Sequence, residues 1–115
     1  MSAVELSAED AKLVTLARGA RGRVSADEGA AVRDETGRTY SGATVALGAL
    51  SLSALQLAVA QAAASGARGL EAAVVVSRSP EPATSDLDAL RALGGAGVVV
   101  HVVGPDGTLL VTVTS

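Results

Sequence analysis

The stretch that decides the fold is uncharged and reads Leu50-Ser-Leu-Ser-Ala-Leu-Gln-Leu-Ala-Val-Ala-Gln-Ala-Ala-Ala-Ser-Gly66. Ser51 or Ser53 can cap the start of a helix here, and Gly66 can end it. The residues between them are mostly leucine, alanine, valine and glutamine, most of which favour helix. Because no face of this helix carries a charge, we expect it to be buried, with the rest of the chain packed around it.

The composition limits what kind of protein this can be. A length of 115 residues predicts a single domain over residues 1–115 with one core. Tyr40 is the only aromatic residue, so the core must consist of small and branched aliphatic side chains in close contact. The net charge of −3 argues against nucleic acid as a partner. The absence of cysteine excludes disulfides and thiolate metal sites.

The location can also be predicted. The sequence has no charged segment followed by an apolar one at its start, so we expect no signal peptide and a soluble cytoplasmic protein. The run without charge between Arg38 and Arg68 raises the alternative of a membrane span. That run contains several polar residues, is rich in alanine rather than leucine, and lacks aromatic anchors on both sides, so we expect no membrane contact.

The N-terminal part predicts a first helix. Ser7 is suited to cap it, with Asp10 at the capping-box position. Gly19 and Gly22 predict its end. A small basic cluster near that end suits the helix dipole, which explains the cluster without a bound anion. Its members are Arg18, Arg21 and Arg23.

Strand, turn and helix signals fill the rest of the chain. The predicted strands are 29–33, 38–45, 70–77, 98–103 and 108–114, with turns at 34–37 and 104–107 and a short link at 46–50. Thr84 or Ser85 caps a short helix that stops at 94–95. The order α-β-β-α-β-α-β-β predicts a three-layer α/β/α fold with a mixed five-stranded sheet. The last two strands should be antiparallel, because a four-residue turn is too short for a crossover.

Local sequences along nearly the whole chain resemble the small cytidine deaminases. That family has a Gly-Ala-Ala strand and turn, then Cys-Ala-Glu or His-Ala-Glu at the start of the central helix. Pro-Cys-x-x-Cys follows at the next helix, and a Pro-Asp-Gly turn precedes the last strand. The corresponding segments here are 29–42, Ser53-Ala54-Leu55, Pro82-Ala83-Thr84-Ser85-Asp86 and Pro105-Asp106-Gly107.

The resemblance implies that the zinc site is lost. In zinc deaminases one His or Cys and two Cys hold Zn²⁺, and a glutamate carries the proton between bound water and the base. By position, Ser53 replaces the first ligand, Leu55 the glutamate, and Ala83 and Asp86 the two cysteines. A serine hydroxyl is a poor zinc ligand, alanine is none, and leucine cannot move a proton. We therefore expect no metal, no cofactor and no catalytic residue.

The resemblance also implies a remnant of the substrate pocket. Near Thr44 and Ala46 the family has the asparagine and glutamate that hold the ribose. The expected pocket residues are Thr44, Ser53, Ala54, Leu55, Pro82, Ala83 and Asp86. We interpret the chain as a catalytically inactive oligomeric module, a dimer or tetramer, with a protein partner as a further expectation. The alternatives are a binder of a nucleoside or other small molecule in this pocket, and a hydrolase with a non-standard site.

Other residues with chemical potential have structural interpretations. His101 is the only histidine and lies within an apolar strand, so we expect a packed core or interface residue rather than a metal ligand. The pairs Asp27-Glu28 and Asp34-Glu35 fall at a strand entrance and a turn, which favours solvated carboxylates. The final strand, rich in threonine and valine, is a second expected contact, because an exposed edge invites pairing.

Overall fold

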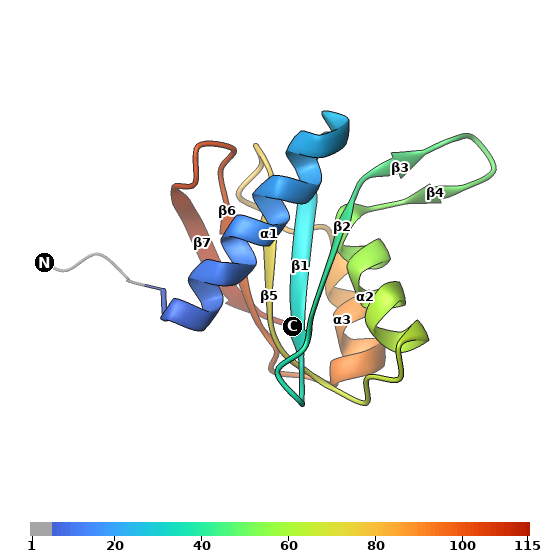
Figure 1. The fold of residues 1–115 in the computed structure, drawn as a ribbon, viewed down its shortest axis with the longest axis vertical. Coiled ribbons are helices and arrows are strands. Elements are labelled where there is room, and N and C mark those ends of the chain that lie inside the picture. The colour runs from blue at the N-terminus through green and yellow to red at the C-terminus, as the bar shows by residue number, and fades with distance from the viewer. Residues whose placement is uncertain (1–5) are drawn as a thin grey trace, which may run out of the picture.

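The structure, a computed structural model, describes residues 6–115 and has three layers (Figure 1). The predicted order of helices and strands is confirmed, with one short hairpin added. The elements are α1 (Ala8–Val24), β1 (Gly29–Asp34), β2 (Thr39–Ala43), β3 (Val45–Ala46), β4 (Ser51–Leu52), α2 (Ala54–Ala64), β5 (Leu70–Val76), α3 (Thr84–Gly94), β6 (Val99–Val103) and β7 (Leu109–Thr114).

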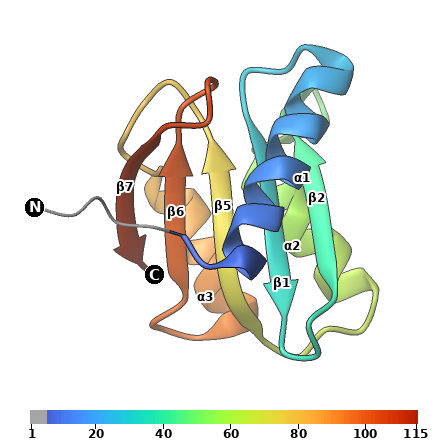
Figure 2. The same cartoon turned by 60° about the vertical axis from the view of Figure 1, so that its left-hand side comes forward.

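The main sheet has five strands in the order β2-β1-β5-β6-β7 (Figure 2). Only β5 and β6 pair in parallel, and the other three pairs are antiparallel. The mixed sheet and the antiparallel final pair are therefore as predicted. Because β1 runs antiparallel to β5, the start of β1 and the end of β5 meet at one edge, with Gly29 opposite Val76.

The helices cover both faces of this sheet. Helix α1 lies on one face, and α2 and α3 lie on the other (Figures 1 and 2). Leu13 and Ala17 of α1 pack on one face of the sheet, while Leu55 of α2 and Leu90 of α3 pack in the core on the other face. Strand β5 is buried on both faces except at Glu71, because helices cover it from both sides. Aliphatic side chains thus fill the core, as the composition requires.

Glycine allows two helices to approach the sheet closely. A Cβ on Gly42 of β2 would lie 2.9 Å from the carbonyl oxygen of Ala54 in α2. A Cβ on Gly29 of β1 would lie 2.1 Å from the carbonyl oxygen of Ala17 in α1. Real Cβ atoms do not approach backbone this closely, so both contacts depend on glycine. The close spacing is how a core without large rings reaches normal density.

Helix α1 is longer than the glycine signals indicated. It passes Gly19 and Gly22 and ends only at Val24, where Ser25 caps it with a left-handed φ of 51°. A glycine inside a helix costs about 1 kcal/mol, which the packing of the buried residues of α1 on the sheet outweighs. The prediction that these glycines end the helix was wrong.

The central helix begins four residues after the start of the uncharged stretch at Leu50. Helix α2 begins at Ala54, because Leu52 and Ser51 pair with Val45 and Ala46 in a two-stranded sheet. The predicted link at 46–50 is therefore the tip of a hairpin, β3–β4, which projects from the body of the molecule (Figure 1). At the tip the Leu47 N–H donates to the carbonyl of Leu50 at 2.9 Å.

The long uncharged run is divided among several elements. It supplies β2, the hairpin and α2, and α2 has only 11 residues. A membrane-spanning helix needs about 20 apolar residues. No helix within residues 6–115 is long and apolar enough to cross a bilayer.

Candidate functional site

The start of α2 is held by a complete capping box. The Ser53 hydroxyl oxygen accepts a hydrogen bond from the Gln56 N–H at 3.0 Å, and the Gln56 side chain accepts one from the Ser53 N–H at 2.9 Å. This arrangement satisfies two backbone donors that would otherwise be unpaired at the helix end. The N-cap is thus Ser53, one of the two serines that the sequence offered.

The same serine joins α2 to α3. The Ser53 hydroxyl donates to Asp86 Oδ1 at 2.5 Å. Asp86 lies in the first turn of α3 and is only 3% exposed. The N-cap of α3 is Ala83, which has no side-chain cap, so the prediction of a cap at Thr84 or Ser85 was wrong. The starts of two helices are tied together by a hydroxyl and a carboxylate.

The structure does not gather the predicted pocket residues in one cavity. Ala54 and Leu55 are fully buried in the core and Asp86 nearly so. Thr44 and Ser53 line an open cavity of about 390 Å³, whereas Pro82 and Ala83 are absent from its lining among residues 6–115. The cavity lining is Asp27, Glu28, Thr44, Ser53, Ser77, Arg78 and Ser79.

Sequence reasoning missed the residues of this cavity that follow β5. Ser77, Arg78 and Ser79 were assigned to a strand end and a loop. Their place follows from the sheet, because the end of β5 lies beside the start of β1, which Asp27 and Glu28 precede. An antiparallel β1–β5 pair, had it been predicted, would have brought these segments together.

Asp34 is buried, so its interpretation as a solvated turn carboxylate was wrong. It is 2% exposed and accepts hydrogen bonds from the Thr36 N–H and hydroxyl, the Arg38 N–H and the Tyr40 hydroxyl. Burial alone raises the pKa of Asp34, but these hydrogen bonds outweigh it and lower the pKa to about 2. The carboxylate thus closes the β1–β2 turn and does not face a reaction site.

His101 is buried between the sheet and α1, as predicted for a packed histidine. Its Nδ1 lies 2.9 Å from Thr112 Oγ1, and its Nε2 lies 2.9 Å from Asp10 Oδ2. The other Asp10 oxygen lies 3.0 Å from the Arg33 guanidinium. Burial raises the pKa of Asp10, but the hydrogen bonds with His101 and Arg33 outweigh it and hold the pKa below its ordinary value. This network fixes the start of α1 on the sheet.

The residues at the expected metal position do not fit zinc. The donor set there is one serine hydroxyl, which already donates to the one carboxylate, and an alanine side chain without a donor atom. Zinc sites in proteins use three or four nitrogen, sulfur or carboxylate ligands. No group of three or more histidine, aspartate or glutamate side chains within residues 6–115 could hold a metal ion.

Comparison with known proteins agrees with this α/β/α fold. The family model described as cytidine deaminase-like matches residues 6–107. The chain therefore belongs to the cytidine deaminase-like family. A search among curated proteins finds no match.

Solved structures of cytidine deaminases share the fold. The enzyme from Burkholderia pseudomallei has a TM-score of 0.77 and 21% identity, covering 96% of this chain and 92% of that one. The enzyme from Mycobacterium leprae has a TM-score of 0.72 and 20% identity, covering 94% of each chain. The enzyme from Mycobacterium tuberculosis has a TM-score of 0.70 and 22% identity, covering 82% of this chain and 85% of that one. Identities this low establish similarity of fold.

Proposed function

We propose that this chain is a cytidine deaminase-like protein without zinc-dependent deaminase activity that serves as an oligomeric structural or interaction module. The observation that carries the proposal is the 2.5 Å hydrogen bond between Ser53 and Asp86. By resemblance these residues stand where two of the metal ligands would be. A direct bond between them engages the serine hydroxyl and one carboxylate oxygen, two of the few atoms there that a metal ion could use.

The proton-transfer position supports the same proposal. Deamination by this class of enzyme needs a metal-activated water and a carboxylate that moves the proton. Leu55 stands at the carboxylate position by resemblance and is fully buried in the core. Asp86, the acidic residue at one of the expected ligand positions, is engaged with Ser53.

Elemental analysis together with a cytidine deamination assay tests the loss of zinc chemistry. The protein is produced in zinc-supplemented medium, and zinc per chain and uridine formation are measured. We expect far less than one zinc per chain and no turnover. As a matched control, the variant Ser53→Cys/Leu55→Glu/Ala83→Cys/Asp86→Cys restores the family's residue types and should gain zinc. Stoichiometric zinc or clear turnover in the unaltered chain would refute the proposal.

Exposed apolar residues on and beside the hairpin support the oligomer. Leu47 is 73% exposed and Leu50 is 54% exposed at the hairpin tip. An apolar groove of about 380 Å³ at the hairpin base is lined by Val24, Leu57 and the residues 43–47. No charged residue occurs between positions 38 and 68, so two copies could meet here without like-charge repulsion.

Sedimentation of the native chain and of two variants tests the oligomer and its surface. We expect a dimer or tetramer that dissociates in Leu47→Asp/Leu50→Asp. The matched variant Leu110→Asp, on the edge strand β7, should leave the assembly intact. Dissociation by Leu110→Asp alone would move the contact to the β7 edge. A strictly monomeric native chain at high concentration would refute the oligomer.

A second candidate function is binding of a small molecule. The observation that favours it is that the cavity beside Ser53 is open rather than filled by side chains. Its volume of about 390 Å³ lies within the range of known ligand pockets. Binding of cytidine, uridine and other small molecules can be measured by calorimetry on the same protein sample.

A further inference from the structure

The cavity beside Ser53 brings charges of opposite sign together without pairing them. Asp27 and Glu28 approach it from the segment before β1, and Arg78 approaches it from the loop after β5. Among residues 6–115, none of these three side chains takes part in an ion pair. Residues of both charges, two acidic and one basic, thus line one open cavity, and within the described residues none of them is held in a salt bridge.

The backbone that carries these charges is anchored. The Glu28 N–H donates to the Thr44 hydroxyl at 3.1 Å, and the Thr44 N–H donates back to the Glu28 carbonyl at 3.2 Å. On the other side, the Ser77 N–H donates to the Val103 carbonyl at 2.9 Å and the Ser79 N–H donates to the Ser77 hydroxyl at 3.1 Å. Anchored segments lose little freedom when a ligand binds, which favours affinity.

The lining disfavours a nucleobase. Base recognition relies on stacking against aromatic side chains. No aromatic residue lines the cavity, and the hydroxyl of the only aromatic residue, Tyr40, is bound to Asp34 at the β1–β2 turn. The lining instead offers hydroxyls and charges, which suit a small polar ligand.

We infer that the cavity binds a small zwitterion, a free amino acid, with its ammonium group at Asp27 and Glu28 and its carboxylate at Arg78. This inference rests on the second candidate function, that the cavity is a binding site. A guanidinium matches a carboxylate through two parallel hydrogen bonds, and a carboxylate pair suits an ammonium donor. A ligand with both charges satisfies both sides of the cavity, whereas an uncharged nucleoside satisfies neither.

Calorimetric titration with single-charge analogues tests the ligand class. Each of the twenty common amino acids is titrated into the full chain, with cytidine and uridine alongside. The amino acid that binds is then compared with its methyl ester, which lacks the carboxylate, and its N-acetyl form, which lacks the ammonium. We expect each analogue to bind at least about tenfold more weakly, the effect of about 1.4 kcal/mol.

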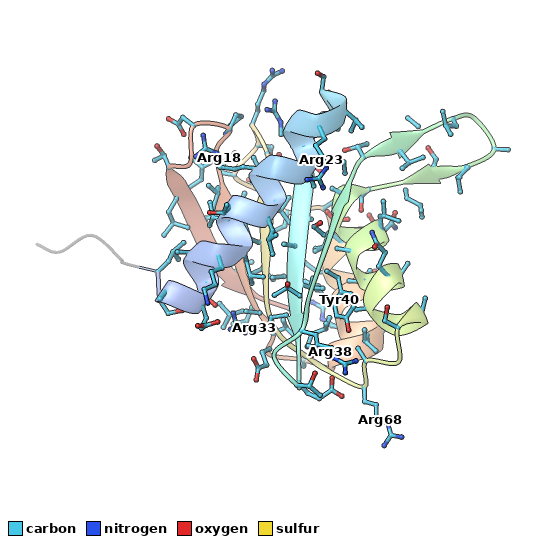
Figure 3. The ribbon with its side chains drawn as sticks, viewed as in Figure 1. Arg18, Arg23, Arg33, Arg38, Tyr40 and Arg68 are labelled. Atoms are coloured by element: carbon cyan, nitrogen blue, oxygen red, sulfur yellow. The ribbon has the colours of Figure 1, made fainter. Side chains whose placement is uncertain are left out.

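Variants assign each charge to its partner. In Arg78→Gln the amino acid and its methyl ester should bind equally weakly. In Asp27→Asn/Glu28→Gln the amino acid and its N-acetyl form should bind equally weakly. Arg68→Gln, at the opposite end of the molecule (Figure 3), is the matched control and should bind as the native chain does. Melting temperatures within a few degrees of the native value show that the variants fold.

The possible results distinguish a wrong ligand class from a cavity that is not a binding site. Binding of cytidine without binding of any amino acid would keep the cavity as a binding site but overturn the ligand class. Binding of no probe would overturn both. An unchanged preference for the amino acid over its methyl ester in Arg78→Gln would also overturn the assignment. The oligomer and the absence of zinc are measured separately and are unaffected.

Discussion

Replacing Ser53 with alanine removes both bonds of one hydroxyl group. The hydroxyl oxygen accepts the Gln56 N–H at the start of α2 and donates to the buried Asp86 carboxylate. Alanine keeps the backbone and nearly the same volume, so the change isolates the hydroxyl. The loss therefore has two parts that can be estimated separately.

The expected loss of stability is about 3 kcal/mol. An N-cap serine replaced by alanine costs about 1 kcal/mol. A hydrogen bond to a charged group contributes about 1.5–3 kcal/mol, and here Asp86, at 3% exposure, has little water to replace it. For a domain of this size, 1 kcal/mol shifts the melting temperature by about 4 °C, so we expect a decrease of about 12 °C.

Urea unfolding of a double-mutant cycle measures the second part alone. The variants are Ser53→Ala, Asp86→Ala and the two combined, because Asp86→Ala leaves the capping bond of Ser53 in place. We expect a coupling energy of at least about 1.5 kcal/mol between the two sites. The matched control Ser51→Ala, on the exposed strand β4, should change stability by less than about 0.5 kcal/mol.

A coupling energy near zero would refute the tie between the helices. It would mean that the hydroxyl acts only as a cap and that Asp86 finds equal partners elsewhere. A loss in Ser51→Ala equal to that in Ser53→Ala would refute the assignment of the cap as well.

Three further predictions concern the scaffold. Gly42→Ala should destabilise the fold by about 1–3 kcal/mol, because the added Cβ meets the α2 backbone. Gly22→Ala has open space around it and should stabilise α1 by about 1 kcal/mol. Thermal unfolding of the two variants and the native chain measures both effects. The pKa of Asp34 is lowered from 3.8 to about 2, so its ionised carboxylate stabilises the fold above about pH 4. This contribution should disappear as the pH falls toward 2. Urea unfolding at several pH values should show it in the native chain and not in Asp34→Asn. His101→Phe should leave Asp10 without one partner and raise the rate of hydrogen exchange in the first turn of α1.

Most of the fold could be predicted because its elements carry local signals. Apolar runs and turn residues marked β5, β6 and β7, and serine marked the starts of α1 and α2. The hairpin β3–β4 was missed, because strands of two residues have no alternation to detect. The extension of α1 past Gly19 and Gly22 was missed, because packing on the sheet outweighs glycine's low helix propensity.

The contacts of Ser53 could be predicted only where they depend on local sequence. Ser53 as an N-cap follows from its neighbours, but its bond to Asp86, 33 residues away, depends on how α2 and α3 sit together. The burial of Asp34 was missed for a similar reason. The turn residues around Asp34 indicated a solvated carboxylate. In the structure the Tyr40 hydroxyl, from the returning strand β2, donates a hydrogen bond to the buried carboxylate.

The contact of Asp10 with His101 has a consequence for the order of folding. The two residues are 91 positions apart, yet their contact fixes the first turn of the first helix on the sheet. Contacts across so much sequence form late, because the intervening chain must be closed first. During synthesis on a ribosome, α1 can therefore dock fully only after β6 has emerged. Until then the apolar face of α1 can pack on β1 and β5, but its first turn lacks the partner that holds Asp10.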